Sequence, residues 1–207
     1  KVRRVKHHAA LNWQEAPEFW KSLKESESIS AAATGFTILT ATRSSEVRLM
    51  RRREVDVTNA VWTIPGERMK AGKEHRVPLT PEALALIGIE GSPDALVFES
   101  PMNRGRPLSD MSLTAVLKRM GRDDITVHGF RSTFRDWAGE TTGHPREVIE
   151  HALAHQIKDK AEAAYARGDL FTKRRRLMED WAAFVTSVVK RDAESSNVVA
   201  LPAQAAN

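Results

Sequence analysis

The stretch Val127-His-Gly-Phe-Arg-Ser-Thr-Phe-Arg-Asp-Trp137 opens a helix that is predicted to run to about Thr142. Its His128 and Arg131 are three residues apart, a spacing that puts both side chains on one face of a helix. The N-terminus of a helix also attracts phosphate, through its free N–H groups and its dipole. By itself His-x-x-Arg is a weak motif, because a capping histidine and a solvated arginine often have this spacing. The stretch therefore predicts a phosphate site only if other basic groups converge on it.

The rest of the chain surrounds this helix with further helices and one short β region. Apolar residues recur at helical spacing from Trp13, and a second helix is predicted over about Ser28–Thr40. Two short apolar runs within Val55–Ile64 form a hairpin pattern, and His75–Leu79 predicts a third strand. The predicted fold is mostly α with a small three-stranded antiparallel β-sheet (α+β).

Composition limits the classes of protein that the chain can belong to. Its 207 residues fit one domain with a proper core, and 32 lysines and arginines against 27 acids give a net charge of +5. This charge is compatible with a nucleic-acid partner but does not establish one. The absence of cysteine excludes disulfides and thiol nucleophiles and suits a reducing cytosol. No apolar run approaches the roughly 20 residues of a membrane span, so we predict a cytoplasmic protein without a membrane partner.

The two ends of the chain differ from its middle. Residues 1–12 are basic and lack periodicity, which predicts a linker, whereas residues 13–190 have the pattern of one domain. Residues 191–207 are poor in large apolar side chains and predict a disordered tail. Because the chain starts with Lys1 and not with Met, we expect it to be part of a longer protein.

Two basic side chains upstream are candidates for the phosphate site. Arg43 follows an apolar helix that should be buried, and Glu46, three residues later, could hold its orientation. The alternative is an ordinary ion pair at a helix end. Lys70 lies in the predicted turn between the second and third strands, where a lysine could reach into DNA and protonate an oxygen. A solvated hairpin tip is the alternative there, and Lys73 competes for the same role.

The chain has one tyrosine, Tyr165, which lies ten residues after His155. A tyrosine hydroxyl becomes a good nucleophile only when a neighbour takes its proton or cations stabilise its anion. Small alanines around Tyr165 favour an accessible ring, whereas the alternative is a packed amphipathic side chain. His151 and His155 are four residues apart and could bind zinc, but no His-Glu-x-x-His arrangement exists. We predict neither a metal nor a cofactor.

The order and spacing of these residues resemble the catalytic domain of the tyrosine recombinases, the phage-integrase family, and most closely the integrases of prophages and genomic islands. The resemblance covers roughly residues 13–185. Its motifs are Leu39-Thr-Ala-Thr-Arg43-Ser-Ser-Glu46, Met69-Lys70-Ala-Gly-Lys-Glu-His-Arg-Val-Pro-Leu79, His128-Gly-Phe-Arg131, Leu153-Ala-His155 and Ala-Ala-Tyr165-Ala-Arg167. The second motif assigns the lysine role to Lys70 over Lys73.

Three positions depart from the family pattern. Ala41-Thr42 stand where a glycine commonly precedes the first arginine, and Ala154 stands where many relatives have glycine. The spacing from His155 to Tyr165 is one residue longer than the commonest spacing. None of these changes removes a catalytic group, so they indicate a subgroup.

The resemblance implies that Tyr165 attacks a DNA phosphate. The attack would form a 3′-phosphotyrosyl link and release a 5′-hydroxyl. Lys70 would protonate the leaving 5′-oxygen, and His128 would assist proton transfer at the nucleophile. The covalent link conserves the energy of the broken bond, so the resemblance implies neither ATP nor metal.

The resemblance also assigns the groups that hold the phosphate. Arg43 and Arg131 would stabilise charge on its non-bridging oxygens, with Glu46 orienting Arg43. His155 would donate a hydrogen bond to the same phosphate.

The partners implied by the resemblance are double-stranded DNA attachment sites and three further copies of the chain in a synaptic homotetramer. DNA-bending or directionality proteins would be accessory factors, and an N-terminal DNA-binding region would precede the linker. The implied function is site-specific integration or excision of a mobile element at the nucleoid of a bacterium. Two alternatives remain open. A type IB topoisomerase shares the chemistry without a specific site, and an inactive DNA-binding module would form no covalent adduct.

Overall fold

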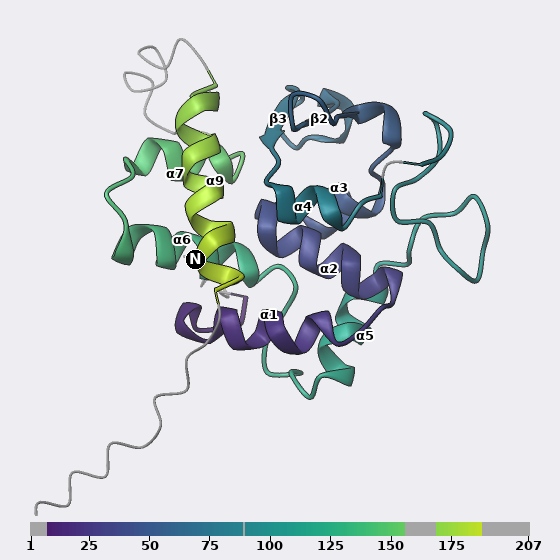
Figure 1. Cartoon of the computed structure of the whole chain (residues 1–207), viewed down its shortest axis with the longest axis horizontal. Coiled ribbons are helices and arrows are strands. Elements are labelled where there is room, and N and C mark those ends of the chain that lie inside the picture. The colour runs from purple at the N-terminus through teal and green to yellow at the C-terminus, as the bar shows by residue number, and fades with distance from the viewer. Residues whose placement is uncertain (1–7, 89, 156–168, 188–207) are drawn as a thin grey trace, which may run out of the picture.

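The structure is a computed structural model that describes residues 8–88, 90–155 and 169–187 (Figure 1). Its helices are α1 (Ala16–Lys24), α2 (Ile29–Thr40), α3 (Ser44–Arg48), α4 (Pro81–Ala85), α5 (Ser112–Arg119), α6 (Phe130–Thr141), α7 (Arg146–Ala152) and α9 (Phe171–Val185). Its strands are β1 (Val55–Asp56), β2 (Val61–Ile64) and β3 (His75–Pro78), and short 3-10 helices span Trp13–Glu15, Arg52–Glu54 and Gly66–Arg68. The predicted class is confirmed, since the described residues are mostly helical and form one three-stranded antiparallel sheet with the order β1-β2-β3.

Helix α2 lies at the centre of the fold because most of its surface is apolar or small. The Ser28 hydroxyl begins the helix by accepting a hydrogen bond from a backbone N–H of the first turn. Gly35 lets α1 approach closely, since a Cβ at this position would lie 3.1 Å from the Trp20 ring. Nearer the C-terminal end of α2, Trp181 of α9 donates its indole N–H to the Ile38 carbonyl at 2.9 Å. The residues that follow α2 are therefore anchored to a rigid element.

The sheet is a meander whose last loop includes Lys70. Trp62 of β2 lies opposite Val77 of β3, and its side chain is fully buried. Its ring centroid is 5.6 Å from that of Phe36 in α2. This packing holds the base of the loop between β2 and β3, at whose exposed end Lys70 lies.

Helices α6, α7 and α9 lie together on one side of the molecule (Figure 1). The Trp137 ring of α6 packs against Trp181 and Phe184 of α9, with centroid distances of 5.0 and 5.7 Å. The first turn of α9 is joined to β3 by Arg174, which is 1% exposed and donates to the Arg76 carbonyl at 2.5 Å. These contacts hold the start of α6 and the end of α7 near α2.

The domain boundaries suggested by composition stay predictions. Residues 8–12 run across the start of α6, and Leu11 is 3% exposed. Residues 1–7 of the predicted linker and the whole of the predicted tail, 191–207, lie outside the described residues. In the part of the chain that the structure describes, no helix is long and apolar enough to cross a membrane.

Candidate active site

Arg43 lies at the joint between α2 and α3, and Glu46 fixes its position. The backbone N–H of Arg43 donates to Glu46 Oε2 at 2.8 Å, and its guanidinium Nη1 donates to Oε1 at 2.7 Å. The Glu46 side chain is 4% exposed and that of Arg43 is 24% exposed. One buried carboxylate therefore orients both the backbone and the side chain of a partly accessible arginine.

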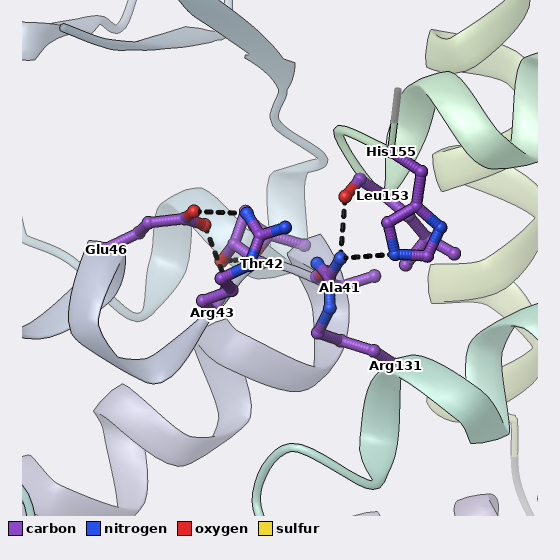
Figure 2. Close-up of polar contacts among 8 residues, drawn as sticks. Ala41, Thr42, Arg43, Glu46, Arg131, Leu153 and His155 are labelled. Carbon is purple, nitrogen blue, oxygen red and sulfur yellow. Dashed lines mark hydrogen bonds and ion pairs between the residues drawn. The ribbon is translucent and has the colours of Figure 1, made fainter. Parts of the chain in front are cut away.

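Arg131, from the first turn of α6, is buried between the ends of two other helices. Its Nη1 donates to the Ala41 carbonyl and its Nη2 to the Leu153 carbonyl, both at 2.6 Å (Figure 2). Ala41 and Leu153 are the C-terminal caps of α2 and α7. Helix C-termini have free carbonyls and the negative end of the dipole, so both favour a cation here. Burial, and then the neighbouring Arg43 cation, lower the pKa of Arg131 to about 10, which leaves it charged at neutral pH.

His155 follows α7 and contacts Arg131 directly. Its Nε2 is 3.1 Å from Arg131 Nη2, and its Nδ1 is 2.6 Å from Glu150 Oε2. Because arginine can only donate, Nε2 is the acceptor, and the ring proton lies on Nδ1 and is donated to Glu150. Burial lowers the pKa of His155 more strongly than the bond to Glu150 raises it. In this arrangement His155 is a neutral acceptor, and it must gain a proton before its Nε2 can donate to an anion.

His128 lies two residues before α6, and several basic groups lie near it. Its ring centroid is 4.5 Å from that of His8. Partial burial lowers the pKa of His128, and Arg131, His8, Arg43 and His155 lower it further. A histidine held neutral in this way can accept a proton from a nearby hydroxyl.

The described residues thus bring two arginines and two histidines to one place. Figure 2 shows Arg43 entering from the α2–α3 joint, and Arg131 entering from α6 beside His155. Two fixed guanidinium groups beside neutral histidines are suited to holding an anion with several oxygens, such as a phosphodiester. Among the same described residues, no group of three or more His, Asp or Glu side chains is placed to hold a metal ion.

Lys70 and Tyr165 are not joined to this cluster by contacts of the described residues. Lys70 is exposed in the loop between β2 and β3, and so is its rival Lys73. Tyr165 lies outside the described residues. The nearest described residues on either side of it are anchored, His155 by Arg131 and Asp169 by an ion pair with Arg174 at 3.0 Å. His155 thus lies at the cluster, whereas Asp169 lies beside α9 and β3, where Arg76 also pairs with it at 3.2 Å.

His75 is a residue of the site region that the sequence reasoning missed. Burial lowers its pKa to about 4, and the cations of Arg174, Arg131 and Arg43 contribute in that order. His75 is thus neutral and lies within the field of both arginines of the cluster. Its one signal in the sequence is its place in the Lys70 motif, but only the strand register decides where its side chain lies.

The comparisons with known proteins agree with this geometry. Residues 10–169 match the model of the phage integrase family. The chain belongs to this family. Prophage integrase IntA of Escherichia coli (strain K12) is 35% identical over 167 residues, which are 78% of this chain and 39% of that protein. This phage-integrase chain therefore spans less than half the length of that relative.

Solved structures of integrases share its fold. The integrase from mycobacterium phage Brujita aligns with a TM-score of 0.63 at 18% identity, over 92% of this chain and 63% of that one. A lambda integrase (75–356) dimer bound to a COC' core site aligns with a TM-score of 0.54 at 17% identity, over 75% of this chain and 62% of that one. At these identities the likeness establishes the fold, and the recombinase fold expected from the sequence motifs is confirmed.

Proposed function

We propose that this chain is the catalytic domain of a site-specific tyrosine recombinase, which cleaves and rejoins DNA to integrate or excise a mobile element. The observation that carries the proposal is the pair Arg43 and Arg131. They come from segments far apart in the sequence, and each is held by its own buried contacts. Membership of the phage integrase family supports the same function.

The proposed cleavage step is a transesterification. The Tyr165 oxygen bonds to phosphorus while the bond from phosphorus to the 5′-oxygen breaks. The tyrosine proton passes to His128, and the 5′-oxygen takes a proton from Lys70. Arg43 and Arg131 stabilise the charge that builds on the non-bridging oxygens. Rejoining reverses these transfers with the 5′-hydroxyl of another strand, so neither ATP nor a metal enters the balance.

His155 has to change its role when a phosphate is bound. Its Nε2 accepts a hydrogen bond from Arg131 while the proton lies on Nδ1. A phosphate between these groups would draw the Arg131 donor to itself and favour a second proton on His155, and Glu150 would stabilise the resulting imidazolium. The predicted donation from His155 to the phosphate therefore includes uptake of one proton.

The proposed partner is double-stranded DNA at attachment sites, bound by four copies of the chain in the synaptic complex. The lambda integrase dimer with this fold was solved bound to a COC' core site, and the net charge of +5 favours a polyanion. DNA-bending or directionality proteins would be accessory factors, and the bacterial cytoplasm, at the nucleoid, would be the location.

A covalent-trapping experiment tests the proposal. The chain, and separately the full product of its gene, would be incubated with nicked duplexes cut from DNA that flanks the gene, in EDTA, and run on a denaturing gel. We expect a protein band shifted by attached DNA, absent from the Tyr165→Phe variant because that variant lacks the attacking oxygen.

Two outcomes would contradict the proposal in different ways. If neither protein gave an adduct although both bound the duplexes, the chain would be an inactive DNA-binding module. Adducts on any sequence, with relaxation of supercoiled plasmids, would indicate a topoisomerase.

A further inference from the structure

Gly129, inside the His128-Gly-Phe-Arg131 motif, is required by a close backbone approach and not by its own conformation. Its φ of −57° and ψ of −29° are ordinary helical values that any residue adopts. A Cβ at this position, however, would stand 2.1 Å from the Ala9 carbonyl oxygen and 2.8 Å from the Ala10 Cα. The backbone of residues 9 and 10 therefore lies directly against the motif, where only a hydrogen atom fits.

Hydrogen bonds hold this N-terminal segment in place. The Ala9 carbonyl accepts from both the backbone N–H and the hydroxyl of Thr126, at 3.0 and 3.1 Å. The Leu11 carbonyl accepts from the Thr133 hydroxyl at 2.7 Å. The segment is thus tied on both sides of Gly129, and it places the residue that precedes the segment beside the motif.

That residue is His8, and its ring meets the ring of His128. The two centroids are 4.5 Å apart and the ring planes are inclined by 54°. The other charged or titratable groups that act on His128 are Arg131 from α6, Arg43 from the α2–α3 joint and His155 from the end of α7. All of these lie on the side of the arginine cluster. His8 comes from a different segment of the chain.

We propose that His8, held by the packing of residues 9–11 on Gly129, is a positioning residue that fixes the ring of His128 for proton transfer. It acts by contact, through its ring, and exchanges no proton with the DNA or the nucleophile. The segment ahead of the first helix is then part of the active site and not only a connection. This inference rests on the proposed recombinase function, because His128 has a catalytic role only there.

The test measures the rate of covalent adduct formation with protein in excess over a nicked duplex, at saturating concentration and over pH 5 to 9. The variants are His8→Ala, which removes the ring, and His8→Phe, which keeps a flat ring without a titratable nitrogen. His144→Ala is the matched control, since that histidine lies in the loop between α6 and α7, bonded to Asp180. Duplex affinity and the melting temperature are measured for each variant.

We expect His8→Ala to lower the saturated rate by about tenfold, a fraction of the roughly 10²–10⁴-fold that general acid–base groups contribute. Because His8 and the burial it provides lower the pKa of His128, the rise of rate with pH should also move to higher pH in this variant. His8→Phe should restore most of the rate. The control should match the wild-type protein, and the exposed His8 position should leave the melting temperature unchanged.

Any other result contradicts either the role of His8 or the proposed recombinase function, and the experiment distinguishes these two failures. Unchanged saturated rates in His8→Ala, or a change in duplex affinity alone, would show that His8 does not position His128. A rate for His8→Phe as low as that of His8→Ala would show that His8 carries a proton itself. If the wild-type protein gave no adduct, the proposed function would fail first.

Discussion

At the scale of single residues, Glu46 supports the site through Arg43, although it has no contact with the phosphate in the proposed mechanism. Its buried carboxylate accepts hydrogen bonds from the backbone and the guanidinium of Arg43. Glu46→Gln keeps the shape of the side chain. Its amide NH₂ group, however, would face either the backbone N–H or the guanidinium of Arg43, and two donors cannot form a hydrogen bond with each other. We expect adduct formation to slow by at least about tenfold at unchanged duplex affinity, and the free energy of unfolding to fall by about 1–3 kcal/mol.

Single-turnover adduct assays and urea unfolding of Glu46→Gln check this prediction. Glu18→Gln is the control, because Glu18 is an exposed carboxylate in the first turn of α1. A rate for Glu46→Gln that equals the control's rate would mean that Arg43 is oriented without its carboxylate.

The sequence could predict those site residues whose partners are near in the chain. Glu46 is three residues from Arg43, and helix periodicity is enough to pair them. The carbonyl partners of Arg131 are 90 and 22 residues away, at Ala41 and Leu153. No local pattern specifies such contacts. The acceptor role of His155 was missed for the same reason, since it depends on where Arg131 lies.

At the scale of elements, two departures from the family's glycines mark the helix ends that bind Arg131. Ala41 and Ala154 have φ of 51° and 49°, in the left-handed region that costs a residue with a Cβ about 1–2 kcal/mol. Both lie at the ends of helices whose carbonyls accept from Arg131, one after α2 and one after α7. The strain therefore lies where the chain must turn sharply to present those carbonyls.

We predict that Ala154→Gly relieves this strain and stabilises the protein. The gain is offset by the greater freedom of glycine in the unfolded chain, so the free energy of unfolding should rise by about 0.5–1 kcal/mol. Ala152→Gly, at the last residue of α7, should lower it, because glycine has more freedom in the unfolded chain and the change removes a buried methyl group. Urea unfolding of both variants is the measurement. A loss of stability in Ala154→Gly would show that the turn is not strained.

The sequence predicted the helices and strands themselves better than it predicted the contacts between them. The helix from about Ser28 to Thr40, the strands within 55–79 and the helix after His128 were predicted from their own residues and are found in the structure. The joint between α9 and β3 was not predicted. It depends on Arg174, a buried arginine that donates to the carbonyls of Asp169 and Arg76. In the sequence this residue is one of three consecutive arginines, and only packing shows which of them is inside.

At the scale of the whole molecule, the cluster exists because α2, α6 and α7 end or begin at one place. Arg131 connects them, and the packing of α9 on α2 and β3 holds the arrangement together. The same convergence places His75 of β3 in the field of three arginines. A histidine there is kept neutral by the fold as a whole, so its protonation is coupled to global unfolding.

The pH dependence of stability should therefore reveal His75. Its pKa is about 4 in the folded protein and about 6.5 in an unfolded chain. Below pH 6.5 the unfolded chain takes up a proton that the folded protein refuses, so the stability from His75 is full above pH 6.5 and is lost as pH falls toward 4. Each unit of that shift is worth about 1.4 kcal/mol, so we expect about 2 kcal/mol to be lost between pH 7.5 and 5 through this group.

Urea unfolding of the wild-type protein and of His75→Gln at pH 7.5 and 5 isolates this contribution. His128, His151 and His155 also have lowered pKa values, so their protonation destabilises the fold at low pH in both proteins. Glutamine has no proton to gain, so only the wild-type protein loses the contribution of His75. The difference in free energy of unfolding between the two proteins should therefore be smaller at pH 5 than at pH 7.5. His144→Gln, in the loop between α6 and α7, is the control for the same replacement away from β3. If His75→Gln lost as much stability as the wild-type protein between the two pH values, His75 would not be held neutral, and the arginine cluster would not extend its field to β3.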